Sequence, residues 1–312
     1  MRKIALALAI LGTTLGTALY TAPAHAQATR TWVSGVGDDA NPCSRTAPCK
    51  TWAGAIAKTT AGGEIDALDP GGFGALTITK SITLDGGGGQ VASVLVAGTN
   101  GINVAAQSTD VVILRNLRFD GLLGNGSAPG NAGINGISYS SGAQLVVDNC
   151  DIFGFNTNGI NMSTNNGFLE VRNSTFRNNA QNGINAVGNG GVSIVQIYNS
   201  SFVGTSSSGT PAQGGITAGS AAFVTVANSN FQDLSYGAQT TTGGTLFVDS
   251  SVFSATSNGV LAAGGTTANV SNNSFYGGTA FGGGGSFVTA NNNKLGSITT
   301  QGSTSLTNMT VK

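Results

Sequence analysis

Charged side chains are scarce in this 312-residue sequence, where Asp, Glu, Lys and Arg together make up 8% of the residues and His occurs once. That histidine, His25, lies in an N-terminal segment that we expect to be removed. The remaining chain then has no imidazole to act as a general base, a proton shuttle or a metal ligand. Loss of Arg2 and Lys3 with the same segment leaves eleven basic residues against thirteen acidic ones. Nucleic acid is therefore not an expected partner, because phosphate binding needs clustered Lys and Arg.

The first 26 residues have the order of parts of a secretory signal peptide. Arg2 and Lys3 precede an apolar run, and the small-x-small triplet 24–26 ends just before Gln27. A transmembrane anchor is the alternative, since the run 4–22 approaches the length that spans a bilayer. Its Gly and Thr residues and the cleavage triplet favour removal. We expect bacterial export to the periplasm or the medium, with no membrane span left in the mature chain.

Cysteine is also rare, with three residues in the whole chain. Cys43 and Cys49 lie close together near the start of the mature chain, and an exported protein meets an oxidising environment, so a disulfide between them is predicted. Cys150 is then unpaired and fits a small, buried apolar residue. A reactive thiol is the alternative, but it would need an activating histidine or metal partner.

One phrase, apolar-x-Val-x-Asn-x-x-Phe, recurs throughout the chain and is seen most fully at 168–176. Eight copies can be aligned, and their closing apolar residues follow one another at intervals of 20 to 33 residues. Such a loose period is typical of proteins that stack one repeat on the next. The copies occupy 112–119, 145–152, 168–176, 195–202, 224–231, 246–253, 268–275 and 288–295.

Within each copy apolar residues alternate with polar ones, which is the period of a β-strand. With Val171 pointing inward, Leu169 points inward too, and Glu170 and Arg172 point outward. Asn-Gly pairs before an aliphatic residue, as at 158–160, turn the chain and begin another strand. Each coil therefore holds at least two short strands, and three fit best. The absence of helical spacing between them excludes leucine-rich and ankyrin-type repeats.

The repeat predicts an all-β fold in which the chain winds as a parallel solenoid and equivalent residues stack about 4.8 Å apart. Like side chains then lie on like. One column holds phenylalanines, and another holds asparagines, which tolerate a left-handed backbone and can bond to the amides above and below. The predicted Phe column is Phe119, Phe176, Phe202, Phe231, Phe253 and Phe275. The predicted asparagine ladder is Asn116, Asn149, Asn173, Asn199, Asn228, Asn272 and Asn292, interrupted by Ser250.

Residues 27–63 lack the repeat and are predicted to form an N-terminal cap over the apolar end of the solenoid. Trp52, Ala53, Ile56 and Ala57 share one face of a helix, with Thr51 as its N-cap, so a short capping helix is expected. Residues 64–312 would then form the parallel β-helix, with about ten coils at this repeat length.

With these features the chain resembles the right-handed parallel β-helix proteins of the pectate-lyase-like superfamily, and within it the β-helix repeat proteins of bacterial secretion. The asparagine column, the Asn-Gly-Ile phrases and the segments 48–52 and 78–86 carry the resemblance, which spans roughly 30–312. The resemblance implies a fold that hosts lyases, hydrolases, esterases, adhesins and inert scaffolds. Function must therefore be argued from the site.

The motifs of the superfamily's glycosidases and esterases are absent. The chain has no Asn-Thr-Asp, Gly-His-Gly, Arg-Ile-Lys or Gly-Arg-Pro-Trp, and its adjacent aspartates, Asp38 and Asp39, lie in the predicted cap. Hydrolysis by two carboxylates needs a pair held about 5 to 9 Å apart. Acids are too sparse for such a pair to be expected, so no catalytic residue is predicted.

One outward column nevertheless gathers the kinds of side chain that bind sugars. Arg115, Asp148, Arg172 and Tyr198 occupy it on four successive coils, with Glu170 beside Arg172. These five residues are the candidate ligand-binding site. The alternative interpretation is a solvated sheet that alternates opposite charges to avoid like-charge pairs. A second outward set is predicted at Arg118, Asp151 and Arg177.

Two functions stay open. We expect a secreted or periplasmic scaffold that binds a polysaccharide or the cell-envelope surface without catalysis, with no cofactor and no metal. The rival is a Ca²⁺-dependent lyase of uronate polysaccharides. The resemblance implies that such an enzyme uses an Arg or Lys base and acidic side chains that hold Ca²⁺ against the uronate carboxylate.

Overall fold

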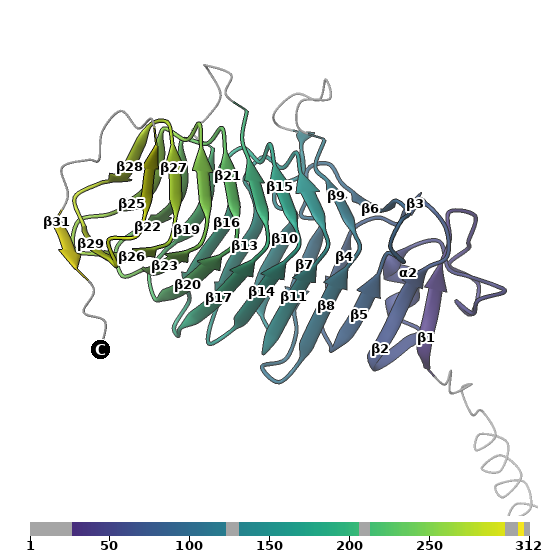
Figure 1. Ribbon diagram of the computed structural model, residues 1–312. Helices are drawn as coiled ribbons and strands as arrows, with labels where there is room; N and C mark the ends of the chain where they lie inside the picture. Colours follow the sequence, from purple (N-terminus) through teal and green to yellow (C-terminus); the bar gives the residue numbers. More distant parts are fainter. Residues whose placement is uncertain (1–26, 123–130, 206–212, 297–304, 309–312) are drawn as a thin grey trace, which may run out of the picture.

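The computed structural model describes residues 27–122, 131–205, 213–296 and 305–308. The predicted signal peptide lies outside them. Within them the chain forms three long sheets of parallel strands wound around a common core, with one short helix toward the N-terminal end (Figure 1). The predicted all-β parallel solenoid is therefore confirmed.

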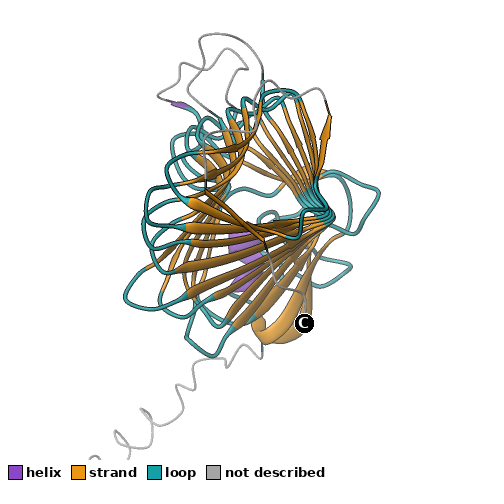
Figure 2. Cartoon of the chain, turned by 60° about the vertical axis from the view of Figure 1, so that its left-hand side comes forward, coloured by secondary structure: helices purple, strands orange, loops and turns teal. Residues whose placement is uncertain are grey.

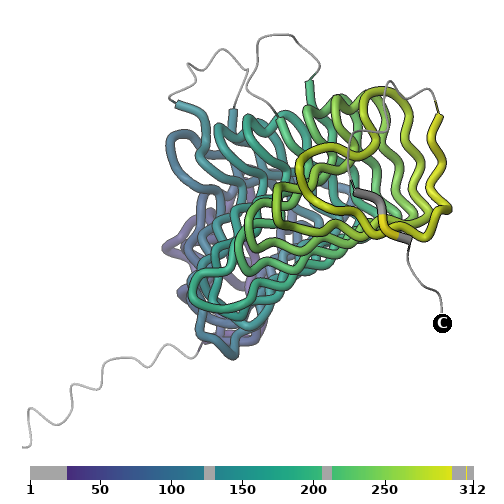
Figure 3. The backbone as a smooth tube through the Cα atoms, turned by 90° about the vertical axis from the view of Figure 1, so that its left-hand side faces the viewer, coloured from purple at the N-terminus to yellow at the C-terminus, as the bar shows by residue number. Residues whose placement is uncertain are grey.

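Each full coil contributes one strand to each sheet. Strand β11 (Gln144–Asp148) belongs to a 12-stranded sheet, β12 (Asp151–Phe153) to a 10-stranded sheet and β13 (Asn158–Thr164) to a 9-stranded sheet. Strands of the next coil pair with them in parallel. Three strands per coil, the fuller of the two predicted arrangements, is what the described residues show. The three faces surround the interior in Figure 2, and Figure 3 shows each coil following the outline of the one before it.

The strand bounds of each sheet follow its spatial order. The 12-stranded sheet runs β1 (Ala28–Val33), β2 (Thr59–Ala67), β5 (Ile82–Asp85), β8 (Val111–Arg115), β11, β14 (Phe168–Arg172), β17 (Ser193–Tyr198), β20 (Ala222–Ala227), β23 (Thr245–Asp249), β26 (Thr267–Ser271), β29 (Ser286–Thr289) and β31 (Ser305–Asn308). The 10-stranded sheet runs β3 (Gly71–Gly72), β6 (Ala92–Leu95), β9 (Arg118–Asp120), β12, β15 (Thr175–Arg177), β18 (Ser201–Val203), β21 (Asn230–Gln232), β24 (Val252–Ser254), β27 (Ser274–Tyr276) and β30 (Lys294–Gly296). The 9-stranded sheet runs β28 (Thr279–Gly282), β25 (Asn258–Ala262), β22 (Tyr236–Thr240), β19 (Gly214–Ala218), β16 (Asn182–Gly188), β13, β10 (Ile137–Ser141), β7 (Ile102–Ala105) and β4 (Leu76–Ile78).

Columns of like side chains fill the interior. Five phenylalanine rings on consecutive coils stack with centroids 4.6 to 5.0 Å apart and planes within 4 to 11° of parallel. They belong to Phe176, Phe202, Phe231, Phe253 and Phe275. Phe119 lies in the same column but is separated from Phe176 by Ile152. The stacked rings align the coils, because stacking holds each ring directly over the next.

The predicted ladder residues lie at the bend between the 12-stranded and 10-stranded sheets. Their backbones are left-handed, with φ between 49 and 59° at Asn116, Asn149, Asn173, Asn199, Asn228, Ser250 and Asn272. Asn149 Nδ2 donates to Asn116 Oδ1 at 2.7 Å, whereas Asn173 Nδ2 donates to Asp148 Oδ1 at 3.0 Å. Each coil thus repeats the bend by adopting the same left-handed backbone conformation. The side-chain amides of the ladder donate hydrogen bonds to amide oxygens at some coils and to carboxylates at others.

The position after most ladder residues carries a polar group that the sequence reasoning missed, whereas Leu117, after Asn116, is apolar. Ser200 Oγ accepts the backbone N–H of Ser174 on the preceding coil at 3.3 Å and donates to Tyr198 O at 2.9 Å. Both serines are buried. The column comprises Cys150, Ser174, Ser200, Ser229, Ser251, Asn273 and Asn293. The recurring Asn-Ser pairs were the available signal for it.

The predicted register is wrong in the last copy, 288–295. It placed Val288 inward, but Phe287 occupies the inward row and is fully buried, while Val288 points outward. The following turn holds one additional residue, which restores the alignment in the next strand. Asn291 takes the left-handed conformation there, and Asn292 Nδ2 donates to the preceding ladder asparagine at 2.7 Å. A one-residue insertion reverses which side chains face inward, because their period is two.

The N-terminal region is tied to the first coils. The predicted disulfide is confirmed between Cys43 and Cys49, whose Cα atoms are 4.6 Å apart. Helix α2 (Trp52–Ile56) follows, and Thr51 Oγ1 accepts the N–H of Gly54 at its start. The predicted division after residue 63 falls inside β2, so the 12-stranded sheet runs through it. The role of the helix as a cap over the core stays a prediction.

Candidate functional site

The outer face of the 12-stranded sheet carries all five predicted ligand-binding residues. Arg115, Asp148, Arg172 and Tyr198 are direct neighbours in the register of β8, β11, β14 and β17. Glu170 lies two residues before Arg172 and points to the same face. The order along the solenoid is therefore the one that the repeat predicted, while the contacts between the side chains divide them into two groups.

Arg172 forms the centre of the first group. Its Nε lies 3.1 Å from Asp148 Oδ2, and its Nη1 lies 2.6 Å from Glu170 Oε1. Its side chain is 43% exposed. The hydrogen bond to Asp148 and the charges of both carboxylates raise the pKa of Arg172 above its ordinary value. Arg172 is therefore a cation with free donors and is poorly suited to accept a proton.

Arg115 turns away from Asp148. Its Nε lies 2.7 Å from Asp85 Oδ2 and its Nη2 lies 3.0 Å from Glu64 Oε2, on the two coils toward the N-terminus. The backbone register alone does not determine this choice, because an arginine can reach carboxylates on either side. Arg115 therefore belongs to a second group at the N-terminal end of the face.

That second group contains three carboxylates, from Glu64, Asp66 and Asp85, with oxygens within 4.8 Å of one another. Arg30 pairs with Glu64 and approaches Asp66 at 3.2 Å. The group lines an open pocket of about 410 Å³. The expectation that acids are too sparse to meet was wrong here. Part of the signal was present in the sequence, because period two puts Glu64 and Asp66 on one face of β2. The register that sets Asp66 beside Asp85 comes from the structure.

The environments of these acids differ. Burial, and then the hydrogen bond and charge of Glu64, raise the pKa of Asp66 to about 6. Burial also acts on Asp85, but hydrogen bonds from Asn116, Gly87 and Arg115 outweigh it and lower the pKa of Asp85. Three carboxylate oxygens this close together could contribute to binding a divalent cation, although exposed acidic groups often occur without one. The adjacent guanidinium groups of Arg30 and Arg115 already neutralise part of their charge, and the absence of a metal stays a prediction.

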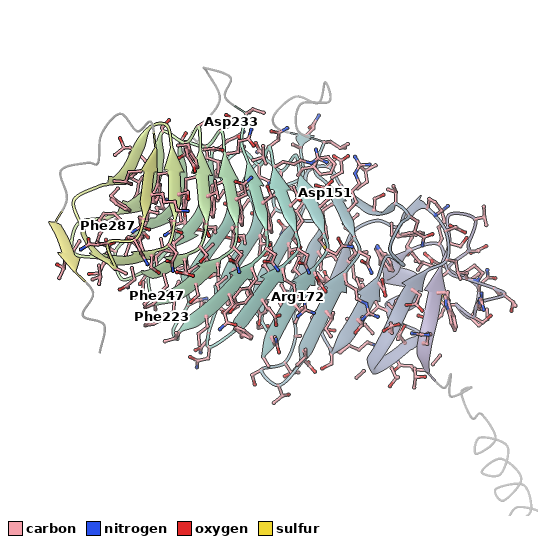
Figure 4. All side chains as sticks on the ribbon, in the orientation of Figure 1. Asp151, Arg172, Phe223, Asp233, Phe247 and Phe287 are labelled. Carbon is pink, nitrogen blue, oxygen red and sulfur yellow. A yellow bond between two sulfur atoms is a disulfide. The ribbon has the colours of Figure 1, made fainter. Side chains whose placement is uncertain are left out.

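The same face is apolar near the start of β14 and β17 and on the coils that follow, which the sequence reasoning also missed. Phe168, Ile194 and Phe223 are neighbours along one outward row, and Phe247 lies diagonally beyond Phe223. The exposed fractions are 45% for Ile194, 46% for Phe223 and 43% for Phe247. Figure 4 labels Arg172, Phe223 and Phe247 along this side of the solenoid.

The second predicted set lies on the 10-stranded sheet. Arg118 and Asp151 are neighbours in register, whereas Arg177 is aligned with Phe153. The Arg177 side chain reaches back to Asp151 with two bonds of 3.0 and 2.7 Å, and its guanidinium lies 3.7 Å from the Phe153 ring centroid. These contacts satisfy Arg177 and Asp151 within the protein, so the set is best explained by packing.

Cys150 is buried, as predicted, and its thiol is not part of a disulfide. Burial raises the pKa of its thiol to about 12. A thiol with that pKa is not deprotonated near neutral pH, which argues against a reactive Cys150.

Among the described residues there is no helix with the length and apolar character needed to cross a membrane.

No protein-family model and no curated protein matches the chain in sequence. Solved structures match it in shape. A GH136 lacto-N-biosidase from Eubacterium ramulus aligns with a TM-score of 0.54 and 10% identity over 90% of this chain and 67% of its own. An alginate lyase from Paenibacillus sp. str. FPU-7 aligns with a TM-score of 0.53 and 15% identity over 89% of this chain and 100% of its own. The chain is a right-handed parallel β-helix. At these identities the likeness of this β-helix to either enzyme concerns the fold alone.

Proposed function

We propose that this β-helix binds a polysaccharide through the outer face of its 12-stranded sheet and does not cleave it. The observation that carries the proposal is that Arg172 is a partly exposed cation held in place by two carboxylates. This cation is held by Asp148 and Glu170 on an open sheet face, next to Tyr198 in the register. Such a group offers hydrogen bonds to sugar hydroxyls without being able to act as a base at neutral pH.

The fold supports a carbohydrate ligand. Two solved structures with a similar fold are named as a lacto-N-biosidase and an alginate lyase. A solenoid of this kind offers a long flat surface, and successive coils repeat the same positions along it. A linear polysaccharide also repeats along its length, so one chain could contact equivalent side chains on several coils.

Export is part of the proposal. The disulfide between Cys43 and Cys49 fits an oxidising compartment. The protein would act in the periplasm or outside the cell, and α2 would cover the N-terminal end of the core, where Trp52 is fully buried against Phe73. The partner would be a polysaccharide of the envelope or of the surroundings.

The rival function is the Ca²⁺-dependent uronate lyase, favoured by the fold shared with an alginate lyase. The two functions are separated by incubating mature protein, residues 27–312, with alginate or polygalacturonate and CaCl₂ and following ultraviolet absorbance of the unsaturated product. The proposal expects no product from either uronate, and binding to at least one polysaccharide of a wider panel in affinity gel electrophoresis. It also expects Arg172→Ala to weaken binding about tenfold, as loss of a charged hydrogen-bond donor does.

Arg177→Ala is the matched control, because Arg177 is similarly exposed and ion-paired but lies on another sheet. Its binding should equal that of the unmodified protein. Product formation that Arg172→Ala abolishes and Arg177→Ala retains would overturn the proposal in favour of the lyase.

A further inference from the structure

The apolar part of the outer face of the 12-stranded sheet consists mainly of aromatic rings that remain exposed in the folded chain. Along β14, β17 and β20 the outward row reads Phe168, Ile194 and Phe223, and β23 adds Phe247. Phe223 and Phe247 each leave more than two-fifths of their surface exposed. Inward neighbours such as Val224 and Leu246 are fully buried. A contiguous patch of this kind on a soluble protein is typical of a binding surface.

Hydrogen-bonding side chains are interspersed with these rings. Gln196 and Thr225 are paired across β17 and β20, and Thr225 is in turn paired with Phe247. Thr245 lies beside Phe223 on the next strand. The face therefore alternates aromatic surface with amide and hydroxyl groups. A pyranose ring has the matching character, since it presents a C–H face that packs on an aromatic ring and hydroxyl groups at its edge.

The charge of the face decides which class of polysaccharide fits. On the described strands of the 12-stranded sheet, three arginines point outward against six carboxylates, so acids exceed bases by three. The carboxylates are Glu64, Asp66, Asp85, Asp148, Glu170 and Asp249, and the arginines are Arg30, Arg115 and Arg172. The guanidinium groups of Arg115 and Arg172 are already paired with these acids. Little positive charge is left for the carboxylates of a polyuronate, which the excess of acids repels.

We infer that the ligand is an uncharged polysaccharide, which lies across the strands with its sugar rings on Phe223 and Phe247 and its hydroxyl groups toward Arg172. Neighbouring strands are about 4.8 Å apart, close to the length of one sugar in an extended chain. Successive sugars thus meet successive coils. This inference rests on the proposed function and adds the class of ligand and the residues that select it.

The test compares neutral polysaccharides (cellulose, β-1,3-glucan, chitin, xylan and mannan) with the polyanions alginate and polygalacturonate. Binding of mature protein is measured by depletion from solution on insoluble material and by affinity electrophoresis in soluble material. At least one neutral polysaccharide should bind at least tenfold more tightly than either polyanion. Phe223→Ala and Phe247→Ala should each weaken that binding about tenfold, the effect of losing one aromatic stacking contact.

Tyr276→Ala is the matched control, because Tyr276 is 49% exposed but lies on the 10-stranded sheet. Its binding should be unchanged. Phe223→Trp and Phe247→Trp keep an aromatic surface and should retain binding, which separates stacking from loss of folding. Circular dichroism of each variant verifies the β-structure.

Each other outcome has a distinct meaning. Binding of polyanions in preference to neutral chains overturns this inference and leaves the proposed polysaccharide binding intact. Binding of no polysaccharide at all overturns both. Neutral binding that is the same in Phe223→Ala, Phe247→Ala and Tyr276→Ala overturns the assignment of the aromatic residues. A dimer in light scattering that Phe223→Ala dissociates, without change in glycan binding, would assign the patch to a second copy of the chain and overturn the inference.

Discussion

Arg172 and Asp148 form an ion pair across two neighbouring coils, with Nε 3.1 Å from Oδ2, although 24 residues separate them in the sequence. The pair is partly exposed to solvent, and such pairs contribute at most about 1 kcal/mol to the free energy of unfolding. Arg172→Ala should therefore lower the unfolding free energy by less than about 1 kcal/mol. Urea denaturation followed by circular dichroism measures it. A much larger loss would show that the pair maintains the sheet and would weaken its interpretation as a binding group.

Stability should instead depend on the stacked phenylalanines. Phe231 is fully buried, and its ring centroid is 5.0 Å from that of Phe202 and 4.6 Å from that of Phe253. Phe231→Ala should cost about 3 to 5 kcal/mol, because it removes apolar surface and leaves a cavity. Phe223→Ala, at an exposed position, should cost within about 1 kcal/mol. Equal losses for the two variants in urea denaturation would contradict the assignment of core and face.

The buried hydroxyl column predicts a contrast between two adjacent serines. Ser200→Ala leaves the buried N–H of Ser174 without its acceptor and should lower the unfolding free energy by about 1 to 3 kcal/mol. Ser201 is less buried, at the start of β18, and Ser201→Ala should change it by about 0.5 kcal/mol or less. Thermal unfolding of both variants checks this. A neutral Ser200→Ala would mean that the column plays no part in holding the coils together.

Asp66 should make stability depend on pH in an unusual direction for an acid. Its folded pKa of about 6 exceeds the ordinary value of 3.8, so the folded protein binds the proton more strongly than the unfolded chain. The contribution of Asp66 to stability is therefore greatest below pH 4 and is lost as the pH rises toward 6. Asp66→Asn removes the charge, and its gain in melting temperature over the unmodified protein should be larger at pH 7 than at pH 4. The same gain at both pH values would contradict the raised pKa.

The sequence was sufficient for the repeating part of the fold. Alternation along Leu169, Glu170, Val171 and Arg172 determines which side chains face inward, and stacking of like residues extends that register from coil to coil. The same logic placed Asp148 beside Arg172. It failed at Val288, where one additional residue in a turn reversed the alternation, and period-two patterns carry no information about such insertions.

The candidate site was less predictable because it depends on side-chain directions and on the irregular first coils. Backbone register made Arg115 a neighbour of both Asp85 and Asp148, and its side chain contacts Asp85 and Glu64, whereas Asp148 pairs with Arg172. Glu64 and Asp66 lie before the first copy of the repeat, so no ladder aligned them with Asp85. The exposed rings of Phe223 and Phe247 were not predicted to form part of a site, since hydrophobicity alone does not show which face is covered.

The central claim is that the outer face of the 12-stranded sheet binds a polysaccharide and leaves it intact. Equilibrium binding of the mature protein to the polysaccharide panel, followed by size analysis of the same polysaccharide samples, tests it most directly. We predict saturable binding that Arg172→Ala and Phe223→Ala each weaken about tenfold, with no change in polysaccharide chain length. Shortened chains, or binding that neither substitution affects, would contradict the account.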